Sequence, residues 1–181
     1  MDRDELRALQ APLKNAYKDD PTQALITLSA KGTLGEGISC SVDTGRALAQ
    51  AGLHPATGGD GTLLCSGDML LEALVACAGV TLNAVATSLA IDIAEGKVHA
   101  EGDLDFRGTL GVEKQAPVGF KDIRLRFELD TDADDEQLAT LLKLTERYCV
   151  VYQTLATNPS LDVALERAKG PHEAGPSAIA S

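Results

Sequence analysis

Residues 67–91, GDMLLEALVACAGVTLNAVATSLAI, decide the fold of this chain. The stretch is apolar for nearly its whole length, so a helix over it, about 36 Å long, presents apolar side chains around most of its circumference. That length would also cross a membrane, but Glu72, Asn83 and numerous Ala and Thr residues interrupt the apolar run. We therefore expect a helix buried at the centre of a globular domain, with no membrane partner.

Alternating and periodic segments on both sides of this helix indicate a mixed fold. Ile123, Leu125 and Phe127 alternate with charged residues, which is typical of a strand with one face in water. The expected strands span residues 24–30, 37–42, 97–106, 123–129 and 161–167, and the other expected helices span residues 2–18, 44–52 and 134–150. The segment 161–167 is nearly as compatible with a helix. This order predicts the α+β class, with antiparallel sheet and segregated helices.

The length of 181 residues suits one domain of ordinary size. We expect an N-terminal helical extension over residues 1–21, kinked at Pro12. The domain itself is expected over residues 22–169. Residues 170–181 are rich in Gly, Pro, Ala and Ser, and we expect a disordered tail there.

The chain is acidic, with 27 Asp and Glu residues against 16 Lys and Arg residues and a formal net charge of -11. Nucleic acids and anionic membrane surfaces bind basic proteins, so this charge argues against both classes of partner. The first ten residues, MDRDELRALQ, contain no apolar segment of a secretory signal. We therefore expect a cytoplasmic protein.

Four cysteines are the main candidates for chemistry: Cys40, Cys65, Cys77 and Cys149. A cytoplasmic protein keeps its thiols reduced, so a disulfide framework is not expected. No CxxC spacing occurs and only three His residues are present, so a structural zinc site is not expected either. The residues leave a choice between inert core thiols and a redox or nucleophilic cysteine.

Cys77 lies in mid-helix beside Ala76, Ala78 and Gly79, small residues that would let a substrate or another element approach the sulfur. Cys149 lies at the end of the second long helix. Two packed helices can bring cysteines within disulfide reach, but the sequence does not show that these two meet. Taken singly, each is better interpreted as a buried core cysteine than as a reactive one.

The remaining candidates are interpreted as structural. Cys40 falls in an expected strand, and Cys65 precedes the long helix beside a Gly-rich loop. His54, His99 and His172 have no ligand spacing, so we interpret them as surface or loop residues.

Two segments of the chain resemble the OsmC/Ohr family of thiol-dependent peroxidases. Residues 67–82, GDMLLEALVACAGVTL, resemble the first cysteine helix of that family, and residues 145–151, TERYCVV, resemble its second cysteine motif. The strands between them follow the family's order, so the resemblance covers roughly residues 22–168. It implies an OsmC-like fold, in which antiparallel sheets wrap around two long central helices in an intertwined homodimer.

The resemblance also implies roles for two cysteines. Cys77 matches the peroxidatic cysteine, whose thiolate attacks the O–O bond of an organic hydroperoxide and becomes a sulfenic acid. Cys149 matches the resolving cysteine, which condenses with the sulfenic acid to a disulfide. An external dithiol reductant, such as a lipoyl protein, is expected to reduce that disulfide. No metal, haem or flavin is implied.

A reactive cysteine in an apolar helix needs support, because burial raises the pKa of a thiol. The family uses an Arg from the early hairpin, held by a carboxylate near the start of the cysteine helix. Here the hairpin carries Lys31 and no Arg, the carboxylate position aligns with Gly67, and Val150 stands where a Pro often follows the second cysteine. The candidate supporting residues are Asp68, Glu72, Lys31, Arg147 and Arg46.

Three functional hypotheses remain. The first is a dimeric two-cysteine hydroperoxide reductase that favours organic hydroperoxides, because the residues around Cys77 are apolar. The alternative is a non-catalytic or redox-sensing small-molecule binding protein on the same fold, which the missing hairpin Arg supports. A cysteine hydrolase ranks last, since it needs a general base and no His lies near either cysteine in the sequence.

Overall fold

A computed structural model describes residues 2–5, 7–8, 10–11, 19, 31–34, 39–43, 48–111 and 113–166. Among these, residues 3–5, 7–8 and 10–11 are helical, as the sequence predicts for the N-terminal segment. Pro12, the expected strand 24–30 and the expected tail 170–181 lie outside the described residues. The division into an extension, a domain and a tail stays a prediction.

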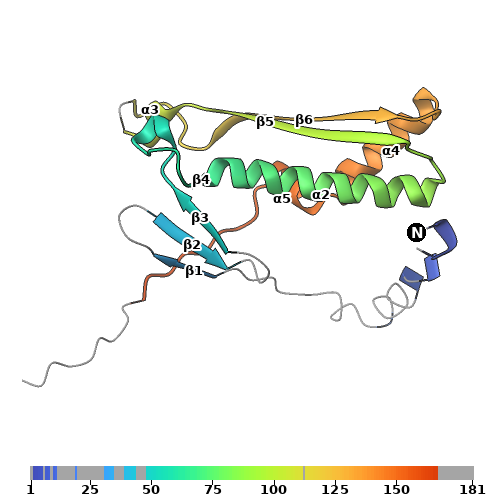
Figure 1. Cartoon of the computed structure of the whole chain (residues 1–181), viewed down its shortest axis with the longest axis horizontal. Coiled ribbons are helices and arrows are strands. Elements are labelled where there is room, and N and C mark those ends of the chain that lie inside the picture. Colours follow the sequence, from blue (N-terminus) through green and yellow to red (C-terminus); the bar gives the residue numbers. More distant parts are fainter. Residues whose placement is uncertain are drawn as a thin grey trace, which may run out of the picture.

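The strands form two sheets (Figure 1). The first sheet has the order β1-β2-β3-β4 and contains β1 (Lys31–Leu34), β2 (Ser39–Asp43), β3 (Leu48–Gly52) and β4 (Leu64–Cys65). Its first three strands are antiparallel, whereas β3 and β4 run parallel over two residue pairs. The second sheet pairs β5 (Glu95–Leu104) with β6 (Phe120–Asp130) in antiparallel register.

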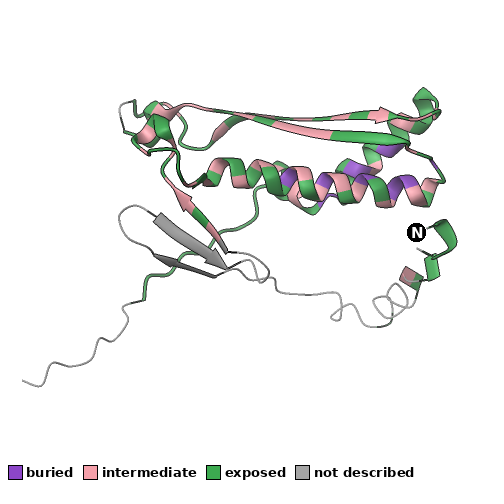
Figure 2. Ribbon diagram, in the orientation of Figure 1, coloured by how far each residue is buried: buried purple, intermediate pink, exposed green. Residues whose placement is uncertain are grey.

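Helix α2 (Ser66–Leu89) is the central element, and the β5–β6 ribbon runs along its length (Figure 1). It is the one helix in the described part of the chain that is long and apolar enough to span a membrane. One face of it nevertheless packs against β5, α4 (Asp135–Tyr148) and α5 (Val150–Ala156). Figure 2 shows the buried residues gathered on α2 and α4. The main core cluster comprises Leu82, Val85, Ala86, Ile91 and Leu141.

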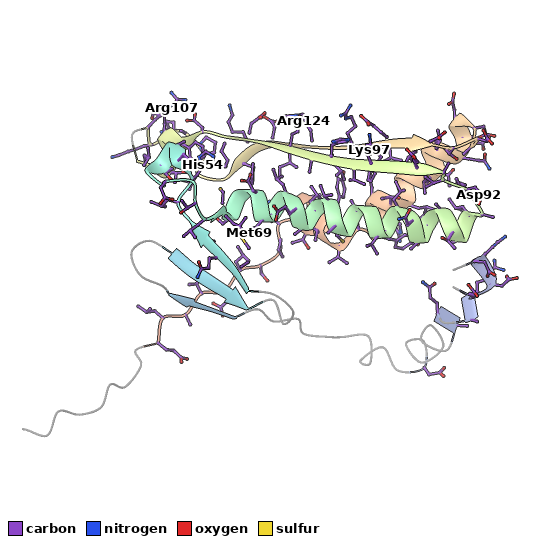
Figure 3. All side chains as sticks on the ribbon, viewed as in Figure 1. His54, Met69, Asp92, Lys97, Arg107 and Arg124 are labelled. Carbon is purple, nitrogen blue, oxygen red and sulfur yellow. The ribbon has the colours of Figure 1, made fainter. Side chains whose placement is uncertain are left out.

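The side chains of strand β6 alternate between half-buried and exposed, as the sequence predicts. Ile123, Leu125 and Phe127 are half-buried and pack against the core clusters, while the residues between them are exposed. Arg124 lies on the side of the ribbon away from α2 (Figure 3), where its Nη2 donates to Asp103 Oδ1 at 2.8 Å. The ribbon therefore has an apolar inner face and a charged outer face.

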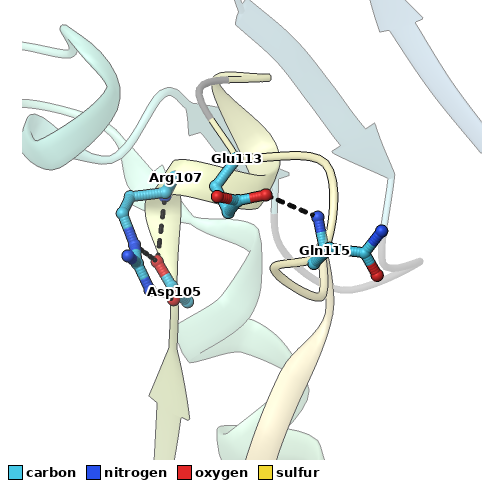
Figure 4. Close-up of polar contacts among 4 residues, drawn as sticks. All are labelled: Asp105, Arg107, Glu113 and Gln115. Carbon is cyan, nitrogen blue, oxygen red and sulfur yellow. Dashed lines mark hydrogen bonds and ion pairs between the residues drawn. The ribbon is translucent and has the colours of Figure 1, made fainter.

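The connection between β5 and β6 is fixed by local polar contacts (Figure 4). Asp105 caps the short helix α3 (Phe106–Thr109) by accepting from the Arg107 backbone N–H and from Arg107 Nε at 2.9 Å. The Gln115 backbone N–H donates to Glu113 Oε1 at 3.0 Å in the following loop. The sequence does not predict the helical turn of α3, whose first residue, Phe106, falls at the end of the expected strand 97–106.

Three expectations about elements are wrong. Residues 48–52 form β3 instead of a helix, because the backbone of the LAQAG segment pairs with β2 and β4, and tertiary hydrogen bonds outweigh the helix propensity of Leu, Ala and Gln. Lys31 lies within β1, opposite Asp43, and not in the hairpin turn. Residues 161–166 form no strand, since no described strand pairs with them.

Candidate active site: the Cys77 and Cys149 thiols

Three helices bring Cys77 and Cys149 together. Cys77 lies in the middle of α2, and Cys149 lies at the junction of α4 and α5, both of which pack against α2. Cys149 forms a buried cluster with Leu74 and Ala78, and Cys77 packs against that cluster at its half-buried edge. The two thiols are free, and they lie close enough for each to shift the pKa of the other.

Cys149 occupies a break between two helices. Its backbone is extended (φ -73°, ψ 108°), its N–H donates to the Thr145 carbonyl and its own carbonyl accepts from the Gln153 N–H, both at 2.9 Å. It therefore ends α4 and begins α5. The first N–H groups of a helix have no partner within that helix. The break thus leaves the N–H groups of Val150 and Val151 free to donate to a neighbouring acceptor, which is the sulfur of Cys77.

The surroundings of Cys77 lower its pKa below the ordinary value of a thiol. Burial is the largest single influence and raises the pKa, but hydrogen bonds outweigh it. The donors are the backbone N–H of Val151, the Cys149 thiol and the backbone N–H of Val150, with a smaller contribution from Thr81. Such bonds stabilise the thiolate, which is the nucleophilic form.

The pKa of Cys149 is shifted in the opposite direction. Burial is again the largest influence and raises the pKa, and the neighbouring Cys77 raises it further. Donation from the backbone N–H groups of Tyr152 and Val151 opposes this rise without overcoming it. The pair therefore consists of a thiol that ionises early and a buried partner that keeps its proton.

Apolar residues surround this pair. The side chains packed against the cluster include Val98, Ile123 and Val151. On the open side, Val80 and Val150 are 72% and 69% exposed. A groove of about 610 Å³ lies behind the cluster, with Leu74 and Tyr152 in its wall; neither cysteine is among its lining residues.

The structure does not bring Asp68 or Glu72 to Cys77. Both are exposed on α2, nine and five residues before Cys77. At about 100° per residue, they point roughly 180° and 140° away from Cys77 around the helix axis. Asp68 instead lies in the first turn of α2, where a carboxylate complements the helix dipole.

The candidate cations are not brought to Cys77 either. Arg147 lies in the last turn of α4 with its guanidinium carbon 5.7 Å from the centroid of the Tyr148 ring. Lys31 is placed only by its backbone, in β1, and Arg46 lies outside the described residues. Within the part of the chain that the structure describes, hydrogen-bond donors and not a cation support the thiolate.

Gly67 lies at the position that aligns with the carboxylate of the OsmC/Ohr motif. A Cβ atom there would meet Cys65 Sγ, Leu104 Cδ1 and Phe120 Cζ, each at 3.5 Å. The position thus faces apolar side chains, which give a carboxylate no hydrogen-bond donor. Cys65 itself is half-buried at the N-cap of α2, as expected of a structural cysteine.

The described histidines have local roles. His54 Nδ1 accepts from the Ala56 N–H at 3.0 Å, and the His54 ring stacks on Phe106 at 4.8 Å. His99 Nε2 lies 3.6 Å from Glu128 Oε2, beyond hydrogen-bond distance. Among the described residues, no group of three or more His, Cys, Asp and Glu residues could hold a metal ion.

Sequence reasoning missed the main support of the candidate site, namely the backbone N–H groups of Val150 and Val151. The sequence predicts one helix over residues 134–150, whereas α4 ends at Tyr148 and α5 starts at Val150. The TERYCVVY segment contains neither Gly nor Pro, so no residue type marks the break.

Comparisons with known proteins agree with this architecture. A sequence model of the family described as OsmC-like protein matches residues 59–164. A comparison with curated proteins found no match. Among solved structures, an OsmC-like protein from Mycoplasma pneumoniae is similar with a TM-score of 0.61 and 19% identity, over 74% of this chain and 89% of that one.

Two further structures are similar at the same level. An organic hydroperoxide resistance protein OsmC from Legionella pneumophila has a TM-score of 0.58 and 17% identity, over 74% of this chain and 92% of that one. An organic hydroperoxide resistance protein from Elizabethkingia anophelis, with crystallant-derived thiocyanate bound, has a TM-score of 0.58 and 19% identity, over 74% of this chain and 91% of that one. At these identities the likeness shows a common fold. Together with the family match, it establishes that this α+β chain has the OsmC-like fold and belongs to the OsmC-like protein family.

Proposed function

We propose that this protein is a thiol-dependent peroxidase that reduces organic hydroperoxides with the Cys77 and Cys149 pair. The observation that carries the proposal is the contact between a thiol of lowered pKa and a buried thiol of raised pKa. A peroxide is attacked by a thiolate, and the second step needs another thiol within bonding reach. The lowered pKa of Cys77 and the packing of Cys149 beside it support both steps.

The proposed cycle has two chemical steps on the protein. The Cys77 thiolate attacks one oxygen of the hydroperoxide, the O–O bond breaks, and the leaving alkoxide takes a proton to become an alcohol. Cys77 is thereby oxidised to a sulfenic acid. The Cys149 sulfur then attacks the sulfenic sulfur, water leaves, and a disulfide between Cys77 and Cys149 forms.

Two electrons from outside are then required to restore both thiols. We propose an external dithiol, such as a lipoyl protein, because thiol–disulfide exchange with a dithiol returns both sulfurs to the reduced form. Sulfur carries the electrons through the entire cycle, so the proposal assigns no metal, haem or flavin.

Organic hydroperoxides are proposed as substrates in preference to hydrogen peroxide. The described side chains around the pair are apolar, and Val80 and Val150 stand exposed beside it. An alkyl or aryl group gains free energy by leaving water for such a surface. Hydrogen peroxide has no apolar group to gain from that contact.

We propose that the protein works as a homodimer in the cytoplasm. Leu161, Val163 and Leu165 are 89–99% exposed in one segment outside the helices and strands, in addition to the exposed Val80 and Val150. Clusters of exposed apolar residues of this kind mark surfaces that bind another protein. A second copy of the chain would cover them and enclose the cysteine pair.

The test is rapid-mixing reaction of the fully reduced protein with cumene hydroperoxide and, separately, with hydrogen peroxide. Thiols are counted before and after reaction in the wild type and in Cys77→Ser, Cys149→Ser and Cys65→Ser. We expect fast loss of two thiols in the wild type and in Cys65→Ser, which is the matched control. Cys77→Ser abolishes the fast reaction, and Cys149→Ser stops it at a sulfenic acid.

A wild-type rate no higher than that of a free thiol would contradict the proposal. The alternative, a redox-sensing or non-catalytic small-molecule binding protein, would then take its place. The 610 Å³ groove behind the cysteine cluster would be the site to examine by ligand screening, because Leu74 and Tyr152 are shared between the groove and the cluster.

A further inference from the structure

Thr81 stands one helical turn after Cys77 on α2 and is half-buried. Its Oγ1 donates to the Cys77 carbonyl oxygen at 2.8 Å. The same hydroxyl is among the groups that lower the pKa of the Cys77 thiol. We propose that Thr81 is a positioning residue for the reaction proposed above, on which this inference rests. Its hydroxyl turns from the Cys77 carbonyl to the Cys77 thiolate and holds the sulfur in place beside α5.

The chemistry of the hydroxyl makes this exchange favourable. A threonine hydroxyl has a single proton to donate, so it serves either the carbonyl oxygen or the sulfur. The carbonyl of Cys77 loses little when the hydroxyl turns away, because an α-helix supplies it with the backbone N–H four residues later, that of Thr81 itself. A hydrogen bond to an ionised acceptor is roughly twice as strong as one between neutral groups. Ionisation of Cys77 therefore draws the hydroxyl to the sulfur.

Few of the side chains around the Cys77 sulfur can donate a hydrogen bond to it, and Thr81 is one of them. The side chains packed around the cluster from β5, β6 and α5 are apolar except for Tyr152, and Cys149 is the other titratable group. On β5, Val98 and Ala100 face the cluster, so the titratable residues Lys97, His99 and Glu101, which alternate with them, face the other side of the ribbon. Apart from the Cys149 thiol, the side-chain hydroxyl of Thr81 is the donor identified at the Cys77 sulfur among the described residues.

The same helix contains a matched control. Thr87 Oγ1 donates to the Asn83 carbonyl at 2.8 Å, which is the same bond to the fourth residue before it. No cysteine stands four residues before Thr87, which is half-buried like Thr81. Replacement of Thr87 by Val reproduces the loss of one such bond from α2 without touching the thiolate.

The experiment measures the rate of Cys77 alkylation by iodoacetamide as a function of pH, with the modified peptide quantified by mass spectrometry. The reduced proteins are the wild type, Thr81→Val, Thr81→Ser, Thr81→Ala and Thr87→Val, each checked for folding by circular dichroism. We expect Thr81→Val and Thr81→Ala to raise the inflection of the alkylation rate by about 0.5 pH units, which lowers the rate about threefold at a pH below that inflection. Thr81→Ser keeps the wild-type inflection because it keeps the donor, and Thr87→Val keeps it too.

Inflections of the alkylation rate in Thr81→Val and Thr81→Ala that equal the wild-type inflection would overturn the inference. A rise in Thr87→Val as large as in Thr81→Val would overturn it as well, since the effect would then belong to the helix and not to the thiolate. The alkylation uses no peroxide. A wild type that fails to reduce peroxide but shows the Thr81 shift would contradict the proposed function alone.

Discussion

The replacement Val150→Pro isolates one backbone donor to the candidate nucleophile. Val150 is the first residue of α5, where proline is well tolerated because its missing N–H has no partner within the helix. The residue before a proline must be extended, and Cys149 already is (φ -73°, ψ 108°). The substitution therefore leaves the fold intact and removes the N–H that donates to the Cys77 sulfur.

The size of the effect follows from the position of that bond. A hydrogen bond to a charged group contributes about 1.5–3 kcal/mol. Val150 is 69% exposed, and water partly replaces the lost donor, so we take about 1 kcal/mol. At 1.36 kcal/mol per pH unit, the pKa of Cys77 rises by about 0.7 units. Proline also reduces the freedom of the unfolded chain, so the free energy of unfolding stays equal or rises by up to about 1 kcal/mol.

The assay is the pH dependence of Cys77 alkylation, combined with urea unfolding. Val150→Ala is the control, because it shortens the same side chain and keeps the N–H. An inflection in Val150→Pro that coincides with that of Val150→Ala would refute the assignment of this N–H as a thiolate donor. A large drop in the urea midpoint of Val150→Pro would refute the placement of the helix start.

Three other predictions address the thiol pair and the core. Replacement of Cys77 by Ala removes the thiolate and should lower the pKa of Cys149, which stays above the ordinary thiol value because Cys149 is still buried. The rate of Cys149 alkylation as a function of pH measures this pKa. An unchanged pKa of Cys149 would contradict the contact between the two sulfurs. Leu141→Ala should reduce the free energy of unfolding by about 2–5 kcal/mol, since Leu141 is 1% exposed in the main core cluster. The adjacent Leu142→Ala, at 45% exposure, should cost less than about 1 kcal/mol in the same urea titration, and equal losses would contradict the packing of α4. Asp134→Ala should cost about 1 kcal/mol in that assay by removing the capping box of α4, and no loss would show that the box does not stabilise the helix.

The parts of the fold that follow from local pattern could be predicted from the sequence. Helix α2 starts and ends within one or two residues of the expected stretch, because its apolar run is long and contains no proline. The inner and outer faces of strand β6 are visible in the sequence, because apolar and charged residues alternate along it. The LAQAG segment of β3 has no such signal, and its strand conformation comes from pairing with β2 and β4.

The candidate site divides in the same way. The motifs around Cys77 and Cys149 single out both residues, but only tertiary packing of α2 against α4 and α5 brings the sulfurs together. The supporting N–H groups belong to the backbone, which a list of candidate side chains omits. The phase of an α-helix alone argues against Asp68 and Glu72, since neither spacing from Cys77 returns to the same face.

The most direct test of the account is the mass spectrum of the reduced protein after one equivalent of cumene hydroperoxide. We predict that the intact protein loses the mass of two hydrogens and that a single disulfide-linked peptide pair contains Cys77 and Cys149. A product in which Cys77 carries added oxygen while Cys149 stays a free thiol would contradict the claim that these two thiols work together.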